Sequence, residues 1–400
     1  MSSNVWKEMT IGSLCNSISE TYHGKDNTVV LVNTSDVLEG SVLNHSPIEN
    51  KNLKGQFKKT FKKDDILFSE IRPANKRFAF IDFDSTQHYI ASTKLMVLRP
   101  NREVVLPRFL YAYLTSNNVL NELQHMAETR SGTFPQITFS SEMAPMRISV
   151  PSKETQERIV SILDSIENKI RYNIKINENL QEQARSIFQS WFIDFEPFGG
   201  AAPSDWHSST LGQVAIMKTD SWSPAKNPDV VVEHYSIPAF DEQHYPVFEI
   251  ASGIKSNKYI LTPDSVMISK LNPDTKRIWR PVCLSEHPVC STEFIVYEAK
   301  KNEQRDYIYS LIDSIPFFNH LCSHTTGSTN SRQRATPKTT LEFSFLLPPD
   351  SVIEEFCNIV TPMYDLIASN LVENQTLTKT RDSLLPRLMS GELDVSDLVL

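Results

Sequence analysis

Residues Val150–Phe192 read VPSKETQERIVSILDSIENKIRYNIKINENLQEQARSIFQSWF, and this stretch decides the fold. It contains no glycine, and its one proline, Pro151, stands at the start, next to the capping residue Ser152. One set of positions recurs every seven residues, namely Ile159, Ile166, Asn173, Leu180 and Ile187, and a second set is interleaved with it, namely Ile162, Lys169, Ile176 and Gln183. This heptad pattern predicts an amphipathic helix of about 60 Å, which needs a partner along its apolar stripe.

Outward from this helix, the chain repeats itself. Trp6 recurs as Trp206, and the helix itself recurs from Pro348. Four further blocks match in the same order: TIGSL (10–14) with TLGQV (210–214), DILFSEIRP (65–73) with SVMISKLNP (265–273), ASTKLMVL (91–98) with CSTEFIVY (290–297), and RFLYAYLTSNNVLNEL (108–123) with DYIYSLIDSIPFFNHL (306–321). Ordered matches of this kind indicate an internal duplication.

The second long helix carries a heptad of its own, with the positions Phe356, Met363, Asn370, Leu377 and Leu384. Because a complete globular segment separates the two helices, we expect them to pack antiparallel against each other. Asn173 and Asn370 occupy equivalent positions in the two heptads. Either they are buried and fix the register of the helices, or they are solvated on a frayed seam.

Each globular segment is expected to be mixed α and β. The strands predicted from β-branched and aromatic runs are Ile66–Ile71, Phe78–Phe83, Ala91–Leu98, Val266–Leu271 and Ser291–Tyr297. One helix is predicted around Leu110–Leu123 and its counterpart around Ile308–Leu321. The break FGGAAPS (198–204) separates the halves. The expected domains are 1–150, 151–198 (first helix), 199–347 and 348–400 (second helix and tail).

The amino-acid composition excludes several classes of protein. The net charge of −8 argues against a protein that coats nucleic acid without specificity, although a local basic face remains compatible with it. No apolar run approaches membrane-spanning length, and the five cysteines form no CxxC pair. We therefore expect reduced thiols, a cytoplasmic location and no membrane partner.

Catalytic motifs are scarce. The sequence has no GxG turn and no Walker loop, and Asn272-Pro273-Asp274, which faintly resembles a methyltransferase signature, has Arg72-Pro73-Ala74 as its counterpart. The potential metal ligands lie only in the second half, without the spacing of structural zinc sites: Cys283, His287, Cys290, His320, Cys322 and His324. The sequence thus predicts neither a catalytic site nor a metal site in this chain.

Recognition of DNA is the function that remains once catalytic and metal sites are set aside. Two globular units joined to long helices suit a ligand with a helical repeat, and base readout needs polar and cationic side chains at a groove. The candidates lie in a lysine-rich stretch (51–63), after one strand of each half, and in a Gly-containing loop before each long helix. They are Lys58, Lys59, Arg72, Lys76, Arg77, Arg130, Ser131, Thr133, Gln136, Asn272, Lys276, Arg277, Arg280, Ser328, Arg332 and Arg334. Solvated loop cations and plain turns would show the same pattern.

The chain resembles the DNA-specificity subunit of type I restriction–modification systems over nearly its whole length. The resemblance rests on PSKETQERIVSILDSIENKI (151–170) with NLQEQARSIFQSWFIDFEP (179–197), which is similar to that family's central helix, and on LLPRLMSGEL (384–393), which is similar to its distal one. Where the family's distal helix usually opens with Glu-Gln, this chain has Val352-Ile353.

The resemblance implies two target-recognition domains, each reading half of a bipartite double-stranded DNA sequence. The antiparallel helices, with pseudo-two-fold symmetry, would set the gap and dock two modification subunits. In such a complex the modification subunits would bind S-adenosylmethionine, and the restriction subunits would bind ATP and magnesium. This chain would bind no cofactor. Two other hypotheses stay open: a self-contained metal-dependent nuclease, and a coiled-coil adaptor without DNA binding.

Overall fold

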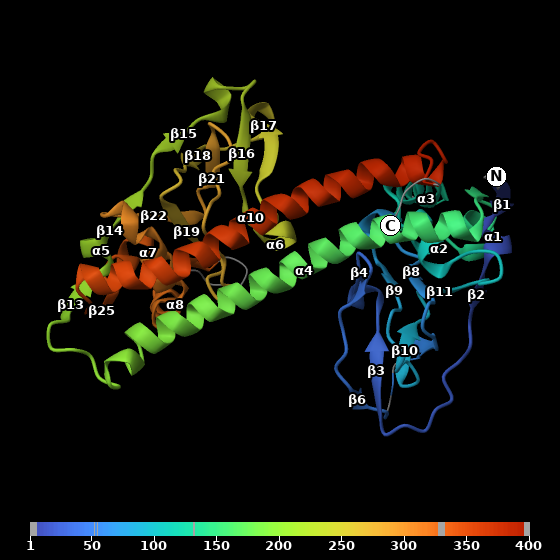
Figure 1. Cartoon of the computed structure of the whole chain (residues 1–400), viewed down its shortest axis with the longest axis horizontal. Coiled ribbons are helices and arrows are strands. Elements are labelled where there is room, and N and C mark those ends of the chain that lie inside the picture. The colour runs from blue at the N-terminus through green and yellow to red at the C-terminus, as the bar shows by residue number, and fades with distance from the viewer. Residues whose placement is uncertain (1–5, 52, 54, 131–132, 327–332, 396–400) are drawn as a thin grey trace. The chain divides into compact units, whose positions relative to one another are not determined.

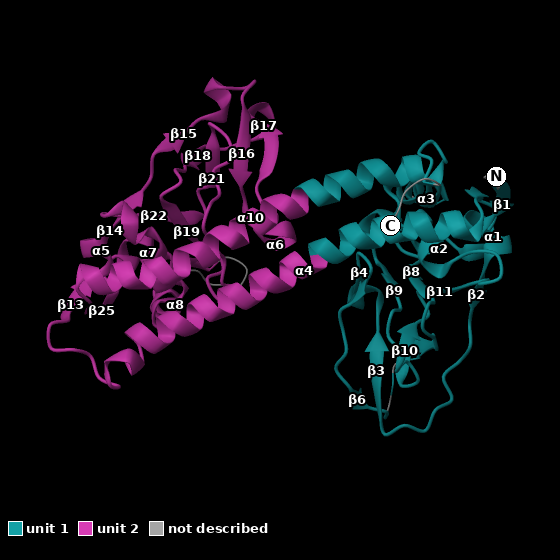
Figure 2. Ribbon diagram, in the orientation of Figure 1, with its two compact units in different colours: residues 1–170, 376–400 teal, residues 171–375 magenta. Residues whose placement is uncertain are grey.

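The structure, a computed structural model, describes residues 6–51, 53, 55–130, 133–326 and 333–395. The chain divides into two compact units, residues 1–170 with 376–400 and residues 171–375 (Figure 2). The two longest helices, α4 (Lys153–Phe192) and α10 (Asp350–Met389), each span 40 residues and contribute one segment to each unit (Figure 1). The first unit is called unit 1 below and the other unit 2.

Unit 1 contains a mixed α/β domain before α4. Its helices and strands are β1 (Lys7–Thr10), α1 (Ile11–Leu14), β2 (Cys15–Ile18), β3 (Thr28–Val32), β4 (Val37–Leu38), β5 (Ser41–Val42), β6 (Ile48–Glu49), β7 (Phe57–Lys59), β8 (Ile66–Ser69), β9 (Phe78–Phe80), β10 (Tyr89–Ser92), β11 (Leu95–Pro100), α2 (Pro107–Leu114), α3 (Asn117–Arg130) and β12 (Arg147–Val150). Short 3₁₀ or π turns are η1 (Thr34–Asp36), η2 (Pro73–Asn75) and η3 (Phe139–Met143).

Unit 2 contains a second mixed domain between the long helices. Its helices and strands are β13 (His207–Thr210), α5 (Leu211–Val214), β14 (Ala215–Lys218), β15 (Ser221–Trp222), β16 (Val231–Tyr235), α6 (Ile237–Gln243), β17 (Val247–Ile250), β18 (Lys258–Ile260), β19 (Ser265–Ser269), β20 (Ile278–Trp279), β21 (Pro288–Ser291), β22 (Phe294–Ala299), α7 (Arg305–Asp313), α8 (Ile315–Ser323), β23 (Thr325–Thr326), β24 (Arg334–Ala335), α9 (Pro337–Thr340) and β25 (Ser344–Leu347). Its 3₁₀ turns are η4 (Glu196–Phe198), η5 (Pro224–Lys226), η6 (Ala251–Gly253) and η7 (Asn302–Gln304).

The sheets of the two units correspond strand for strand. The order β2-β11-β8-β9 in unit 1 matches β14-β22-β19-β20 in unit 2, and β6-β3-β10-β7 matches β17-β16-β21-β18, with β15 added at one edge. In both units the central pair of the second sheet is parallel, β3 with β10 and β16 with β21. The repeat in the sequence is therefore a repeat of sheet topology.

Near the start of each domain, equivalent glycines make the same close backbone contact. The N–H of Gly12 donates to the carbonyl of Ala144 at 2.9 Å, and the N–H of Gly212 donates to the carbonyl of Leu341 at 2.9 Å. A Cβ at these positions would lie 3.1 Å from the Cβ of Ala144 and 3.2 Å from the carbonyl oxygen of Leu341. Close backbone approach explains why the TIGSL and TLGQV blocks both keep glycine.

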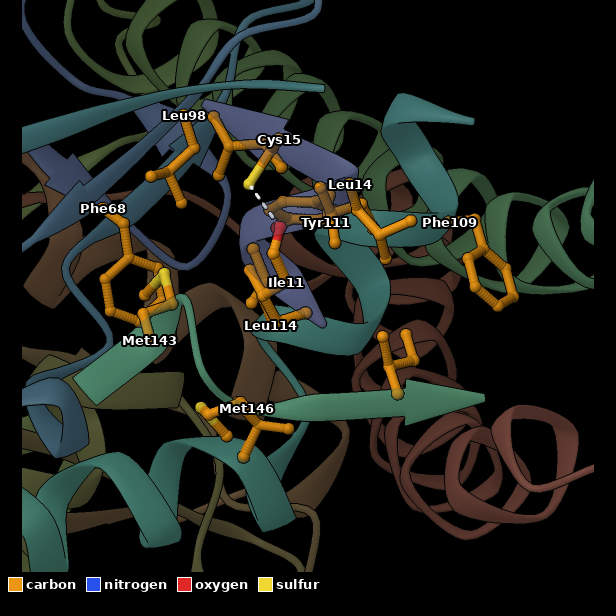
Figure 3. Close-up of a cluster of buried hydrophobic side chains, with 14 of the residues drawn as sticks. Ile11, Leu14, Cys15, Phe68, Leu98, Phe109, Tyr111, Leu114, Met143 and Met146 are labelled. Atoms are coloured by element: carbon orange, nitrogen blue, oxygen red, sulfur yellow. Dashed lines mark hydrogen bonds between the residues drawn. The ribbon is translucent and has the colours of Figure 1, made fainter. Parts of the chain in front are cut away.

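Each unit has its own apolar core beneath these sheets. In unit 1, Ile11 and Leu14 of α1 and Leu98 of β11 belong to one buried cluster with Phe109 and Leu114 of α2, and all five are fully buried (Figure 3). In unit 2, Phe188 of α4 packs on Phe356 of α10 with ring centroids 5.8 Å apart, next to Tyr307 of α7. The long helices are therefore part of both cores.

Two sequence-based predictions of single strands are wrong. Ala91–Leu98 belongs to two strands, β10 and β11, and Ser291–Tyr297 likewise belongs to β21 and β22. In each case a two-residue turn directs the chain from one sheet into the other. Because residues on both sides of the turn are buried, the sequence shows one apolar run. The other three predicted strands exist but end two or three residues earlier.

The predicted single helices are also divided. Helices α2 and α3 meet at Thr115-Ser116, where Ser116 Oγ accepts from the N–H of Val119 at 3.4 Å. Helices α7 and α8 meet at Ser314, whose Oγ accepts from the N–H of Phe317 at 3.3 Å. These serines are N-caps inside an otherwise apolar periodic pattern, and they end one helix by starting the next.

The buried stripe of α4 includes the first predicted set of heptad positions but not the second. Ile159 and Asn173 are buried, and Ile166, Leu180 and Ile187 are half-buried. In the second predicted set, Ile162 is half-buried against the unit 1 core, whereas Lys169, Ile176 and Gln183 are exposed. The second set in the structure lies one residue further on, at Leu163, Ile170, Asn177, Ala184 and Trp191. On α10, Phe356 and Asn370 are buried and Met363, Leu377 and Leu384 are half-buried.

Four asparagines connect α4 and α10 within unit 2. Asn173 Nδ2 donates to Asn374 Oδ1 at 2.9 Å, and Asn370 Nδ2 donates to Asn177 Oδ1 at 2.8 Å. Asn173 and Asn370 are 1% and 6% exposed, which corresponds to the buried alternative. Residue numbers rise along one helix as they fall along the other.

Candidate nucleic-acid interface

Two loops that the sequence singled out separately lie together in each unit. In unit 1 the N–H of Arg72 donates to the carbonyl of Pro135 at 3.1 Å, and the N–H of Ile137 donates to that of Glu70 at 2.8 Å. In unit 2 the N–H of Asn272 donates to the carbonyl of Gln333 at 2.9 Å. We call residues 70–77 with 133–137, and 270–277 with 333–335, the paired loops.

Identical turns lead into the paired loops. Ser69 Oγ accepts from the N–H of Ile71 at 3.0 Å, and Ser269 Oγ accepts from the N–H of Leu271 at 3.2 Å. The next residues, Arg72 and Asn272, both adopt left-handed backbone with φ of 45° and 46°. Since non-glycine residues pay a conformational cost there, the same strained turn in both units marks the paired loops as a shaped feature.

In unit 1 most candidate cations are held by the protein itself. Lys76 Nζ lies 2.9 Å from Glu39, and Arg77 donates to the carbonyl of Ser35 at 3.1 Å. Arg130 pairs with Glu142 at 3.2 Å. Arg72 is exposed and makes no side-chain ion pair within the described part of the chain.

In unit 2 the candidate cations are tied more tightly. Arg277 makes two bonds to Asp241, at 2.6 and 2.9 Å. Arg280 is only 9% exposed and lies 2.7 Å from Asp306 and 2.6 Å from Asp365 of α10. Its guanidinium anchors the domain on the long helix through these two carboxylates.

Asp313 links a candidate cation to the other long helix. This carboxylate is 2% exposed and accepts from Lys276 at 2.6 Å, Arg185 at 2.7 Å and Gln181 at 3.1 Å. Arg185 and Gln181 belong to α4, so a loop residue and the helix share one buried anion. Lys276 is therefore positioned rather than free.

The lysine-rich stretch contributes little to the paired loops. Lys59 Nζ donates to the carbonyls of Thr93 and Leu95 at 2.9 and 2.8 Å, and burial lowers the pKa of this amine. Lys58 is exposed, whereas Lys51 and Lys63 pair with Glu49 and Asp84. Lys59 thus has a structural role in holding the turn between β10 and β11.

The remaining candidates divide by location. Ser131, Ser328 and Arg332 lie outside the described residues. Thr133 is exposed, and Gln136 and Arg334 sit at matched bridges with Ile71 and Leu271. Both side chains belong to the paired loops.

Sequence reasoning missed four charged residues, of which two belong to the paired loops and two lie beside them. Glu70 and Lys94 in unit 1, and Lys270 and Glu293 in unit 2, lie against the same bridges. The signal was present in the matched blocks. In the alignment of the repeat, Glu70 corresponds to Lys270 and Lys94 corresponds to Glu293. Both differences are reversals of charge.

Two further features are absent from the described residues. No group of three or more His, Cys, Asp or Glu side chains there could hold a metal ion. Among the same residues, no helix is long and apolar enough to cross a membrane.

Comparison with known proteins gives the family. Residues 4–182 match the family described as type I restriction modification DNA specificity domain. The chain is 30% identical to the type I restriction enzyme HindI specificity subunit of Haemophilus influenzae, over 97% of this chain and 99% of that protein. The chain belongs to the family of type I restriction enzyme specificity subunits.

Other members of the specificity-subunit family agree in sequence and in fold. The MjaIX specificity subunit of Methanocaldococcus jannaschii is 26% identical over 74% of this chain and 71% of that protein. The S subunit of a type I restriction–modification system from M. genitalium superposes with a TM-score of 0.55 at 17% identity, covering 99% of this chain and 98% of that one. This likeness supports the arrangement of two domains with long helices.

Proposed function

We propose that this chain is the non-catalytic DNA-recognition subunit of a type I restriction–modification complex. The domains at 1–150 and 199–347 each read one half of a bipartite target. The observation that carries the proposal is the recurrence of the paired loops, with the same backbone bonds and the same left-handed turn, on both copies of a duplicated fold. Family membership supplies the class of ligand.

We infer that α4 and α10 form an antiparallel coiled coil with pseudo-two-fold symmetry. The reciprocal bonds Asn173–Asn374 and Asn370–Asn177 support this. Asn173 is equivalent to Asn370 in the repeat and Asn177 to Asn374, so the second bond repeats the first with the two helices exchanged. Buried asparagines on a seam fix register. A helix pair of fixed register would set the number of unread base pairs between the half-sites.

Partner subunits would dock on these helices. Within unit 2, apolar side chains of α4 and α10 are exposed rather than packed: Tyr172 (56%), Ile174 (47%), Ile176 (44%) and Leu366 (46%). Exposed apolar side chains on a long helix suit an obligate protein interface. In this proposal two modification subunits carry the S-adenosylmethionine chemistry, and restriction subunits use ATP and magnesium.

The test is methylation mapping. The chain is expressed with the modification subunits of its own system, and methylated positions are mapped across genomic DNA. We expect adenine methylation at one bipartite motif with a fixed gap, and exchange of residues 1–150 or 199–347 for those of a relative should change one half only.

Three outcomes would contradict the proposal. A metal-dependent cleavage activity of the purified chain alone would favour the nuclease. Methylation that is indifferent to the chain, or unchanged DNA affinity after charge reversal at Arg72 and Arg277, would favour the adaptor.

A further inference from the structure

Three side-chain positions occupy the same backbone scaffold in both units but carry different charges. In unit 1 the N–H of Glu70 donates to the carbonyl of Lys94 at 3.0 Å, and Gln136 bridges Ile71. In unit 2 the N–H of Lys270 donates to the carbonyl of Glu293 at 2.9 Å, and Arg334 bridges Leu271. We call Glu70, Lys94 and Gln136 the unit 1 triad, and Lys270, Glu293 and Arg334 the unit 2 triad.

Within the unit 1 triad a lysine lies between an acid and an amide. Lys94 Nζ donates to Glu70 Oε2 at 3.3 Å and to Gln136 Oε1 at 3.2 Å. The Lys94 side chain is 47% exposed and that of Glu70 is 20% exposed. Because Gln136 accepts through its oxygen, its amide NH₂ group remains a donor.

Within the unit 2 triad an arginine is held by an acid. Arg334 donates to Glu293 from Nε at 3.0 Å and from its terminal nitrogen at 3.2 Å, so the carboxylate fixes the plane of the guanidinium. The Arg334 side chain is 46% exposed and that of Glu293 is 29% exposed. Glu293 thereby holds the guanidinium through Nε and one terminal nitrogen, and the other N–H groups of Arg334 remain as donors.

Stability alone does not account for these differences. Ion pairs at this exposure contribute little to folding, and the bonds that join the paired loops are backbone bonds that every residue type except proline permits. The scaffold is common to both units and the polar side chains on it are not. That is the arrangement expected where two copies of one reading domain select different bases.

Resting on the proposed function, we propose that the two triads are the base-selecting positions of their half-sites. Arg334 presents its guanidinium to a guanine, which accepts from arginine through O6 and N7 in the major groove. Glu293 is a positioning residue that holds the fork. In unit 1 the carboxamide of Gln136 selects an adenine, whose N6 and N7 match an amide, and Lys94 positions it.

The experiment converts the unit 2 triad into the unit 1 triad. The variant Lys270→Glu, Glu293→Lys, Arg334→Gln is expressed with the modification subunits, and its methylated motif is mapped. Domain exchange assigns the half-site that residues 199–347 read. We expect at least one guanine of that half-site to be lost from the motif, with methylation of the original sequence falling about tenfold or more, while the gap and the other half stay unchanged.

Two further variants keep the result interpretable. Arg334→Lys retains the charge and an ion pair with Glu293 but not the fork, so it should assemble normally and still lose guanine selection. Asp220→Asn, which removes the more exposed partner of the ion pair Lys218–Asp220 in unit 2 and lies outside the paired loops, should leave the motif as it was.

A wild-type motif at wild-type efficiency in the triad variant and in Arg334→Lys would overturn the assignment. So would a uniform loss of methylation at all sequences without any change of base preference, which would mark phosphate contacts instead. If the wild-type complex itself produced no bipartite motif, the proposed function would fail first.

Discussion

Gln156, at the start of α4, is a fully buried polar side chain that joins three backbone groups. Its Oε1 accepts from the N–H of Leu106 at 2.8 Å, and its Nε2 donates to the carbonyls of Pro151 at 3.0 Å and Val104 at 3.3 Å. The equivalent residue in α10 is the apolar Ile353, 1% exposed in the unit 2 core.

In unit 2 a different residue binds the corresponding loop. Asp350 accepts from Gln304 Nε2 at 2.7 Å and pairs with Lys301. Helix α10 thus contacts this loop through Asp350, three residues before Ile353, and through side chains rather than backbone groups.

Replacing Gln156 with alanine should destabilise unit 1 by about 2 kcal/mol, because three buried backbone groups lose their partner. Thermal unfolding of the full chain measures it. The matched control is Gln183→Ala on the exposed face of the same helix, where the change should stay within about 0.5 kcal/mol. Equal effects of the two substitutions would contradict the role given to Gln156.

Asp306 gives a dependence of stability on pH. Burial by itself would raise the pKa of this carboxyl, but hydrogen bonds from Arg305 and Arg280 outweigh burial and lower the pKa below its ordinary 3.8. A lowered folded-state pKa means that the stabilisation is fully present above the unfolded-state pKa and is lost as the pH falls through the folded-state pKa.

Asp306→Asn should therefore destabilise unit 2 by about 3 kcal/mol at pH 6, since two arginines lose a buried partner. The difference between the variant and the wild type should shrink as the pH is lowered below about 4. Denaturant unfolding at pH 6, 5, 4 and 3 measures this, with Asp220→Asn, an exposed carboxylate, as the control. A difference that stays constant at every pH would exclude the ionised carboxylate as its source.

At the scale of the helices, the asparagine pairs affect both the register and the stability of the packing between α4 and α10. Asn173 Oδ1 is buried and has no hydrogen-bond partner among the described residues, although its Nδ2 is bonded to Asn374. A buried amide of this kind fixes the register at a cost in stability.

Asn173→Leu alone should destabilise unit 2 by about 1–2 kcal/mol, because Asn374 is left without its donor in a buried site. The double variant Asn173→Leu, Asn374→Leu should recover part of that loss, since the two amides are replaced together. The recovery should be incomplete, because Glu373, which accepts from Asn173 Nδ2 at 2.7 Å, still loses that donor. Thermal unfolding of the two variants provides the comparison, and Asn177→Leu with Asn370→Leu is the matched second pair. A double variant that is less stable than Asn173→Leu alone would contradict this account, because removing the second amide would then cost further stability.

At the scale of the whole molecule, the proposed spacer role of α4 and α10 predicts that longer helices increase the number of unread base pairs between the half-sites. Insertion of one heptad after Ile170 in α4 and another after Gln375 in α10, where the two units divide, keeps the heptad phase. Seven residues lengthen a helix by about 10 Å, which corresponds to about three base pairs.

The methylated motif should then keep both half-sites and gain about three unread base pairs between them. Genomic methylation mapping of the variant complex checks this. Insertion in α4 alone is the control, and it should abolish motif methylation because the two helices no longer match in length. An unchanged gap after the double insertion would contradict the role of the helices as a spacer.

The sequence by itself determined the duplication, the two long helices, the mixed α/β character of each half and the family. These features follow from periodicity and matched blocks, which are properties of neighbouring residues and of internal similarity. It also pointed to both loops of each unit, through polar and cationic residues at equivalent places, such as Arg72 and Asn272, and through a glycine-containing loop before each long helix.

Only the tertiary structure decided which of these residues lie together and which are already engaged. Arg280 and Lys276 have the composition of DNA-contacting cations, yet Asp306, Asp365 and Asp313, distant in sequence, bind them. The position of the buried stripe on α4 was likewise set by packing at Leu163 and Ala184 rather than by hydrophobicity at Ile176. Burial and ion pairing depend on groups that approach through space, and a linear pattern does not contain those distances.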